Sequence, residues 1–290
     1  MKPEQHISSA IAVGLIVAED GRILLQHRDD KPGLVGAGQW GFFGGHVEAS
    51  ERPTQAFLRE IEEELAWRPR HIELFTTREI EHHGGATTSY AYGAHLDVPF
   101  ESLVLGEGQG MALFDPSALP PETMPGIGEV VAQFAASRTY RRLKRRYDVL
   151  TATALLVGAD GRFLLQHRDD KPEIANPGKW GSFGGEIEPG ETPDEGFLRE
   201  MEEELAWAPS RYELYAAVDF PARGSPQLIY IYTALVDVPI EALVLGEGQG
   251  MAYFSPDALP QTIVTELRLL IESFTAGDHY AAMLARTPNS

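Results

Sequence analysis

Apolar and polar positions along the first half of the chain predict an alternating order of strands and helices. An apolar run that ends at Ala18 is followed by Asp20-Gly21, a dipeptide typical of hairpin turns, so we expect a strand pair across this turn. The pattern then predicts a short strand near 40–43, a helix over roughly 53–66, strands at 72–78 and 88–97, a glycine-rich loop at 106–110 and a terminal helix.

The second half of the chain repeats this pattern at a constant offset of 140 residues. Three segments return: 20–32 at 160–172, 57–67 at 197–207, and 104–112, unchanged, at 244–252. Because the offset is constant and long, it indicates a duplicated domain rather than a solenoid. The order β, α, β, α predicts for each copy a mixed β-sheet sandwiched between α-helices, an α/β fold of the mixed α+β kind.

The boundary between the copies is placed near residue 147, which gives domains 1–147 and 148–290. Segment 123–148 is predicted to form a helix after Pro125-Gly126, and a β-rich run opens at Val149. The predicted helix ends in a basic cluster of Arg138, Arg141, Arg142, Lys144, Arg145 and Arg146. This cluster suits a nucleic-acid patch, a solvated helix face or a surface that pairs with an acidic neighbouring domain, and we favour the last two.

Composition narrows the functional classes. The 290 residues include no cysteine, which excludes disulfides, thiolate metal sites and a cysteine nucleophile. A formal net charge of −19 argues against a nucleic-acid partner and repels anionic substrates unless divalent cations intervene, although it also serves solubility alone. The N-terminal apolar run does not read as a signal peptide, and no run approaches the roughly 18 residues that span a bilayer. We expect a cytoplasmic protein with no membrane partner.

The segment most informative about chemistry is an acidic helix. Glu60, Glu63 and Glu64 stand at i, i+3 and i+4, so they share one helix face. In the second copy the same positions hold Glu200, Glu203 and Glu204. A solvated face tolerates such like charges, but here the cluster follows a Gly-Gly turn, where the backbone can approach a ligand, and it occurs twice. Carboxylates at this spacing suit Mg²⁺ or Mn²⁺.

The remaining helix positions predict packing and a start signal. Leu58, Ile61 and Leu65 lie on another face and are expected to pack on the sheet. In the second copy Thr192 is a candidate N-cap, with Pro193 at the first helical position and Glu195 completing a capping box; the first copy has the weaker Arg52. Aromatic side chains expected in the core rather than in a pocket are Trp40 and Trp180.

The acidic segment resembles the Nudix box, G-x(5)-E-x(7)-R-E-U-x-E-E-x-G-U, in which U is apolar. The first copy matches it with Gly45, Glu51, Arg59, Glu60, Ile61, Glu63, Glu64 and Trp67. The second copy matches it with Gly185, Glu191, Arg199, Glu200, Met201, Glu203, Glu204 and Trp207. The late glycine, structural in the family, is replaced by Ala66 and Ala206, which we expect to alter only how the helix ends. The resemblance covers 8–120 and 149–260 and implies two Nudix folds.

The resemblance implies a Mg²⁺-dependent pyrophosphohydrolase, with Mn²⁺ as an alternative metal. Its substrate would be a nucleoside diphosphate linked to another moiety: a nucleotide sugar, ADP-ribose, a dinucleotide or a nucleoside triphosphate. The implied metal ligands are Glu60, Glu63, Glu64, Glu200, Glu203 and Glu204. Glu60 and Glu200 resemble the residue that binds metal or takes the proton from water. The implied orienting arginines are Arg59 and Arg199, and the supporting carboxylates are Glu51 and Glu191.

Residues outside the box complete the expected site. Glu107 and its counterpart Glu247 are candidate metal ligands or bases on a loop whose glycines allow movement, or else belong to a simple turn. Arg28 and Arg168 either clamp a phosphate or pair with the aspartates that follow them. Close backbone approach to the substrate is expected at the two Gly-Gly turns, which comprise Gly44, Gly45, Gly184 and Gly185.

The two copies differ most in 79–96 against 219–236, a region expected to shape the substrate pocket, and at His46, where the second copy has Glu186. We expect both copies to bind metal, and whether both are catalytic is left open. The tandem resembles a homodimer within one chain, and further self-association is also open. The alternative function is a nucleotide-sensing regulatory or structural protein with one catalytic copy. The substrate itself does not follow from the box.

Overall fold

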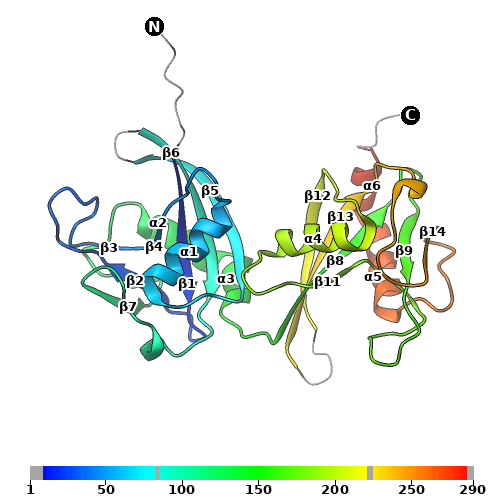
Figure 1. The fold of residues 1–290 in the computed structure, drawn as a ribbon, viewed down its shortest axis with the longest axis horizontal. Helices are drawn as coiled ribbons and strands as arrows, with labels where there is room; N and C mark the ends of the chain where they lie inside the picture. Colours follow the sequence, from blue (N-terminus) through cyan, green and yellow to red (C-terminus); the bar gives the residue numbers. More distant parts are fainter. Residues whose placement is uncertain (1–8, 83–84, 221–224, 286–290) are drawn as a thin grey trace, which may run out of the picture. The chain divides into compact units, whose positions relative to one another are not determined.

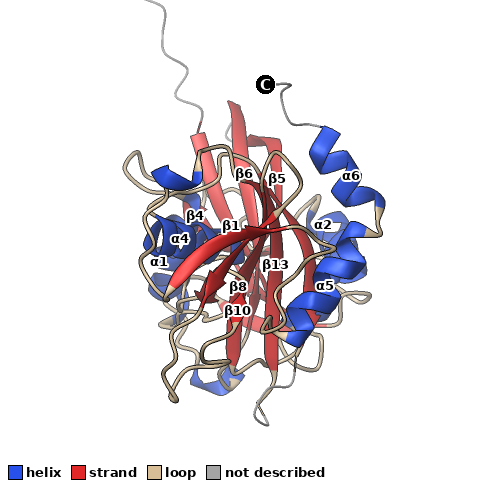
Figure 2. Cartoon of the chain, turned by 90° about the vertical axis from the view of Figure 1, so that its right-hand side faces the viewer, coloured by secondary structure: helices blue, strands red, loops and turns tan. Residues whose placement is uncertain are grey.

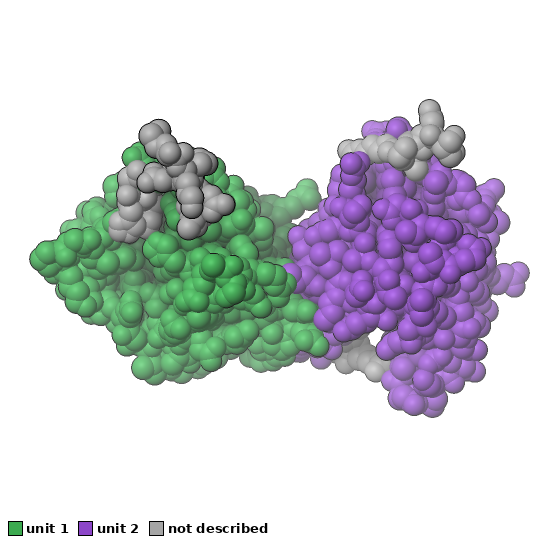
Figure 3. Space-filling model, turned by 45° about the horizontal axis from the view of Figure 1, so that its top comes forward, with its two compact units in different colours: residues 1–146, 188–192 green, residues 147–187, 193–290 purple. Residues whose placement is uncertain are grey.

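The computed structural model describes residues 9–82, 85–220 and 225–285 (Figure 1). The chain divides into two compact units, one of residues 1–146 with 188–192 and one of residues 147–187 with 193–290 (Figure 3). Each unit contains one seven-stranded sheet. Within the described residues, no helix combines the length and the apolar character that crossing a bilayer requires.

The first unit is built on a mixed sheet. Its strands are β1 (Ser9–Val17), β2 (Ile23–His27), β3 (Trp40–Gly41), β4 (Phe43–His46), β5 (Ile72–His82), β6 (Gly85–His95) and β7 (Gly110–Phe114). The path runs β3-β2-β1-β6-β5, with β4 beside β1 and β7 beside β2. β1 and β6 are parallel, whereas the other pairings are antiparallel. The expected strand pair at the Asp20-Gly21 turn is confirmed by the pairing of Ile16 with Leu24.

Helices cover both faces of this sheet, as the sequence pattern predicts. α1 (Pro53–Leu65) packs Ile61 and Leu65 on one face, in a core that includes Ile16 of β1. α2 (Ile127–Ala136) covers the other face, where Phe134 shares a core with Leu15 of β1. The two cores separate at neighbouring residues of β1 because successive side chains of a strand point to opposite faces.

The second unit repeats this architecture (Figure 2). Its strands are β8 (Val149–Val157), β9 (Phe163–His167), β10 (Trp180–Gly181), β11 (Gly184–Glu186), β12 (Tyr212–Asp219), β13 (Gln227–Leu235) and β14 (Gly250–Phe254). Its helices are α4 (Pro193–Leu205), α5 (Thr265–Thr275) and α6 (Asp278–Ala285). α4 and α5 contribute to separate cores on the two faces of the sheet. Short 3-10 helices precede the last strand of each unit, at Phe100–Ser102 and Ile240–Ala242.

The single terminal helix predicted over 123–148 is wrong, because two helices form. α2 ends at Ala136, and α3 (Arg138–Leu143) begins after Ser137, whose hydroxyl accepts a hydrogen bond of 3.0 Å from the backbone N–H of Tyr140. The basic cluster is partly structural, because Arg142 forms an ion pair with the buried carboxylate of Glu73 on β5.

Both acidic helices end at an alanine in the left-handed conformation. The backbone φ is +49° at Ala66 and +47° at Ala206, and the N–H of Ala66 donates to the Glu62 carbonyl at 2.9 Å. Glycine adopts this conformation without steric cost, so each alanine strains the end of its helix. The helix start of the first copy is better than predicted, because the Arg52 N–H donates to Gln55 Oε1 at 2.9 Å.

Trp40 and Trp180, at matching positions of the two copies, pack against the cores of their domains, as predicted. Trp40 stacks on His27, with ring centroids 4.8 Å apart, and packs against the core under α2. Trp180 stacks on His167 at 4.9 Å and packs against the core under α5.

Candidate active site

Glu64 is the buried member of the first acidic cluster. Its carboxylate accepts hydrogen bonds from Gln26 Nε2 on β2, at 2.9 Å, and from the backbone N–H of Gly44 on β4, at 2.7 Å. Burial, with smaller effects from the charges of Glu60 and Glu107, raises the pKa of Glu64 to about 7 despite these bonds. A cation beside Glu64 would offset the cost of a charge in this place.

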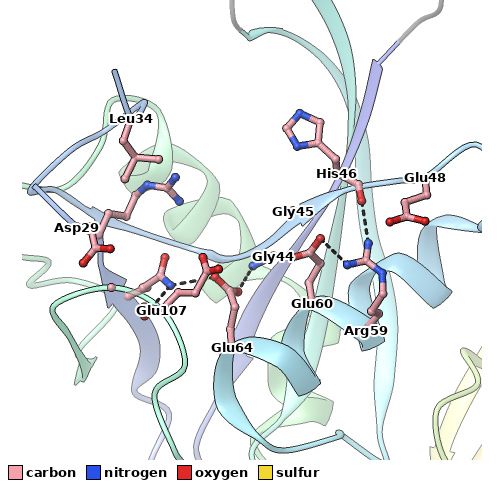
Figure 4. Close-up of a pocket in the computed structure, with 13 residues that line it drawn as sticks. Asp29, Leu34, Gly44, Gly45, His46, Glu48, Arg59, Glu60, Glu64 and Glu107 are labelled. Carbon is pink, nitrogen blue, oxygen red and sulfur yellow. Dashed lines mark hydrogen bonds and ion pairs between the residues drawn. The ribbon is translucent and has the colours of Figure 1, made fainter. Parts of the chain in front are cut away.

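Arg59 links the other carboxylates of the cluster. Its Nε donates to Glu51 at 2.8 Å, and its Nη1 donates to Glu60 at 2.8 Å and to Glu63 at 3.3 Å. Its Nη2 reaches the backbone carbonyl of His46 at 3.1 Å (Figure 4). The hydrogen bond with Glu51 is the main cause that raises the pKa of Arg59, and the same bond lowers the pKa of Glu51.

The three helix glutamates have different environments even though they share one region of α1. The Glu64 residue is 6% exposed, whereas the side chains of Glu60 and Glu63 are 19% and 61% exposed. Across the described part of the chain, no three acidic or histidine side chains converge into a metal-binding group as placed, since Arg59 holds Glu60 and Glu63. The donors nevertheless fit a hard divalent cation: all are carboxylates, and one is buried among like charges. Glu60 and Glu63, which accept hydrogen bonds from Arg59, would hold such a cation together with Glu64.

Gly44 and Gly45, which were expected to form a turn, lie instead in strand β4, where they pack against β1 and α1 without room for side chains. A Cβ on Gly44, whose φ is +125°, would stand 2.2 Å from the carbonyl oxygen of Ala12. A Cβ on Gly45 would stand 2.4 Å from the carboxylate of Glu60. Strand β4 thus delivers a backbone N–H to Glu64 and lets the Glu60 carboxylate lie directly against Gly45.

The loop that carries Glu107 is held in place on both sides of that residue. Gly106 approaches α1 so closely that a Cβ would stand 2.4 Å from the carbonyl oxygen of Glu63. The N–H of Gln109 donates to the carbonyl of His27 at 2.8 Å. The glycine before Glu107 is therefore needed for a close approach. Glu107 lines the same cavity as the acidic helix, and its role as metal ligand or base stays a prediction.

The second unit repeats the buried part of the site. Glu204 accepts hydrogen bonds from Gln166 Nε2 at 3.1 Å and from the N–H of Gly184 at 2.6 Å. Burial raises the pKa of Glu204 to about 7. The Gln166 side chain also donates to the carbonyl of Glu247, at 3.2 Å, so this loop too is tied to the site.

The exposed part of the second site matches as well. Arg199 Nη1 donates to Glu200 at 2.7 Å and to Glu203 at 3.0 Å. A Cβ on Gly185 would stand 2.5 Å from the Glu200 carboxylate. Burial raises the pKa of half-buried Glu200, although the hydrogen bond from Arg199 acts to lower it. Glu191 accepts the N–H of Glu188 at 3.0 Å at the loop before α4.

Arg28 lines the cavity, and a different cation pairs with the nearby aspartate. Arg28 Nε donates to the carbonyl of Val35 at 3.0 Å, while Lys31 pairs with Asp29 at 2.5 Å. Arg168 repeats this arrangement by donating to a loop carbonyl at 2.9 Å. Because a lysine pairs with the nearby aspartate, we keep contact with a substrate phosphate as the prediction for both arginines.

Two depressions adjoin each other at the first site. A cavity of about 280 Å³ lies over the acidic helix and is lined by carboxylates, with Arg28 and Arg59 (Figure 4). A larger cleft, of about 710 Å³, extends over the α2 face of the sheet. Both are lined by the same five residues, Arg28, Leu34, Gly44, Gly45 and His46. An anionic group and an organic group of one ligand would find neighbouring places here.

Gln26 and Gln166 are parts of the site that sequence reasoning missed. They are 3% and 2% exposed, and each ties a helix glutamate to the carbonyl of the loop glutamate. The signal was present in the sequence, because a glutamine follows three apolar residues at the same place of the strand in both copies, ILLQH and FLLQH.

Comparison with known families agrees with this geometry. The NUDIX domain family matches residues 8–134 and 148–274, which is most of the chain. The chain therefore belongs to the Nudix family, as a tandem duplication of two Nudix domains.

Similarity to individual proteins is local. The chain is 38% identical over 71 residues to the 8-oxo-dGTP diphosphatase of Escherichia coli (strain K12), a match that covers 24% of this chain and 54% of that protein. It is 45% identical over 53 residues to the CTP pyrophosphohydrolase of the same strain, covering 18% and 38%. The chain thus spans about half or less of these relatives' length. The crystal structure of the MutT protein from Methanosarcina mazei Go1 is similar at 23% identity and a TM-score of 0.40, covering 44% of this chain and 93% of that one.

Proposed function

We propose that this protein is a Mg²⁺-dependent pyrophosphohydrolase that cleaves the diphosphate bond of a nucleoside diphosphate linked to another moiety. The adjacency of the carboxylate cavity and the larger cleft is the main support, since one substrate would place its diphosphate in the first and its organic part in the second. The names of the two curated relatives make nucleoside triphosphates the first substrates to test.

The carboxylates of α1 and α4 are proposed to hold the metal. In the first domain these are Glu60, Glu63 and Glu64, and in the second Glu200, Glu203 and Glu204. Mg²⁺, or Mn²⁺ in its place, supplies neutralisation of the diphosphate charge when bound. Glu64 is already fixed by Gln26 and Gly44, which leaves the exposed carboxylates to complete the site.

Glu60 and Glu200 are proposed either to complete the metal site or to accept the proton of the attacking water. The water oxygen forms a bond to phosphorus while the bridging P–O bond breaks, and the electron pair of that bond stays on the leaving phosphate. The raised pKa of Glu200, caused by burial, favours proton transfer to its carboxylate. Arg59 and Arg199 are positioning residues, and Arg28 and Arg168 are proposed to bind a phosphate oxygen.

The test is release of phosphate or pyrophosphate from a panel of nucleotides with Mg²⁺. Glu63→Gln should abolish turnover in the first domain, and Glu203→Gln should abolish it in the second. Matched controls are Glu62→Gln and Glu202→Gln, which change the adjacent glutamate of the same helix. Absence of any turnover by the wild-type protein, or full activity in the double variant Glu63→Gln/Glu203→Gln, would refute the proposed function.

The remaining expectations are part of the same proposal. The domains are 1–147 and 148–290, and both bind metal. The tandem acts as an intramolecular pseudo-dimer, with further homo-oligomers left to measurement. The partner is a small-molecule nucleotide rather than nucleic acid or membrane, and the location is the cytoplasm.

A further inference from the structure

The larger cleft of the first domain has an apolar part and a part with polar side chains. Strand β1 and the segment before β4 line it with Ile11, Val13 and Phe42. Strands β5 and β6 and helix α2 line it with polar groups that include Arg78, Ser89 and Glu129. A substrate whose diphosphate lies at the carboxylates would extend its organic group between these two parts.

The polar side chains of the cleft are held by a chain of hydrogen bonds. Arg78 on β5 donates through Nη2 to the side-chain oxygen of Gln133 on α2. The Gln133 amide in turn donates to Glu129 Oε1 at 3.0 Å. One cationic donor and one anionic acceptor of the cleft are therefore linked through Gln133, which limits the movement of both.

The same positions in the second domain carry apolar side chains. Val218 replaces Arg78 and Leu269 replaces Glu129, and these residues are 43% and 59% exposed. Ile229 and Ile231, which replace Ser89 and Ala91, pack with the core under α5. These substitutions remove the charged pair and the small side chains together.

The part of the cleft formed by β1 and the segment before β4 is apolar in the first domain, whereas the matching positions of the second domain are polar. Where the first domain has Val13 and Phe42, the second has Thr153 and Ser182, whose hydroxyl groups are hydrogen-bonded at 2.6 Å. Thr151 likewise takes the place of an isoleucine. The distribution of polar and apolar groups is thus reversed between the domains, whereas the carboxylate sites are closely alike.

From this reversal we propose that the two domains act on different nucleotides, and that Arg78 and Glu129 select the substrate of the first domain. This inference rests on the proposed function and names its substrate class. Arg78 donates to a carbonyl oxygen of a nucleobase, and Glu129 accepts an N–H of the exocyclic amino group of the same base. Guanine carries both kinds of group, so the first domain prefers a guanine-type base over one that lacks the amino group. The second domain, which lacks both charges at these positions, does not make this distinction.

The experiment uses the full chain with one domain silenced at a time. Glu203→Gln leaves the first domain active, and Glu63→Gln leaves the second. Each protein is assayed with guanosine and inosine triphosphates, which differ by the 2-amino group. In the first domain, Arg78→Val or Glu129→Leu should raise KM for the guanosine nucleotide about tenfold and bring the two kcat/KM values together. In the second domain the kcat/KM values for the two nucleotides should already agree within about twofold, without any substitution in the cleft.

A reciprocal exchange and a neighbouring control complete the test. Val218→Arg combined with Leu269→Glu should introduce a preference for the guanosine nucleotide into the second domain. Glu79→Leu changes the residue next to Arg78, whose side chain points to the other face of β5, and should leave the preference of the first domain unaltered.

The outcomes separate this inference from the function on which it rests. Equal preferences of the two single-domain proteins, or an unchanged ratio after Arg78→Val and Glu129→Leu, would overturn the assignment of selectivity while hydrolysis itself stands. If the wild-type protein hydrolyses no nucleotide, the proposed function fails and this inference fails with it.

Discussion

The side chain of Gln26 donates a hydrogen bond of 2.9 Å to the buried carboxylate of Glu64, and so joins β2 to α1 at the candidate active site. The same amide nitrogen reaches the backbone carbonyl of Glu107 at 3.2 Å. One glutamine therefore sets the position of the helix carboxylate relative to the loop. Because hydrogen bonds to charged groups contribute about 1.5–3 kcal/mol, its loss should be measurable.

The first prediction concerns this glutamine. In the Glu203→Gln background, Gln26→Leu should lower kcat at least about tenfold, because Glu64 would lose the donor that orients it. Steady-state kinetics with the best nucleotide of the panel measure this. The same change in the silenced domain, Gln166→Leu, is the control and should have little effect. Equal losses from both variants would contradict a local positioning role.

The two glycines of β4 should respond differently to an added methyl group. In Gly44→Ala the new Cβ meets a backbone oxygen and the residue keeps a positive φ, so we expect a loss of stability of about 2 kcal/mol or more. In Gly45→Ala the Cβ meets only the end of the Glu60 side chain, which can rotate, so activity should fall while the fold persists. Urea unfolding and kinetics on the two variants distinguish these effects. A stable, fully active Gly45→Ala protein would show that the close approach of Glu60 to Gly45 is not needed for activity.

The ends of the acidic helices should tolerate glycine better than alanine. Left-handed alanine costs about 1–2 kcal/mol, partly offset by the entropy that glycine loses on folding, so Ala66→Gly and Ala206→Gly should each stabilise their domain by about 0.5–1 kcal/mol. Thermal or urea unfolding checks this. Ala132→Gly, inside α2, is the matched control and should destabilise by about 1 kcal/mol. If Ala66→Gly and Ala132→Gly changed the free energy of unfolding in the same direction, the proposed strain at Ala66 would be contradicted.

Acid should weaken the first domain through Glu73. Burial raises the pKa of Glu73, but hydrogen bonds from Arg142 and His71 outweigh it and lower the pKa to about 2. A carboxylate with a folded pKa below its ordinary value of about 4.3 stabilises the fold above that pH and loses this contribution as pH falls toward 2. Glu73→Gln should therefore be less stable than wild type by about 3 kcal/mol at pH 7.

The difference between Glu73→Gln and wild type should shrink as the pH falls from about 4.3 to 2. Hydrogen exchange of β5 amides at several pH values would follow the first domain alone. The control is Glu213→Gln, since the Glu213 side chain is 47% exposed and pairs with His279 on α6. A constant difference across this pH range would mean that Glu73 is not titrating as described.

The duplication, the fold class and the grouping of the glutamates on the acidic helix could all be read from the sequence. These features depend on local spacing: a repeat at a constant offset, apolar residues at helical period, and three glutamates on one turn of helix. The face of α1 that packs on the sheet was predictable for the same reason. By contrast, the break at Ser137 was missed, because a helix can continue or stop at a serine and the side-chain cap decides which.

Only the tertiary structure decided how the glutamates differ from one another. Helical spacing places Glu60, Glu63 and Glu64 together, but burial of Glu64 depends on Gly44 and Gln26, which come from other strands. The difference in polarity between the cleft and the matching positions of the second domain was equally hidden, since Arg78 and Glu129 lie on different elements and are linked through Gln133 only when α2 packs on the sheet. Periodicity along the chain determines which residues share an element. Contacts between elements depend on how the whole chain packs, and those contacts set the burial and the partners of each charge.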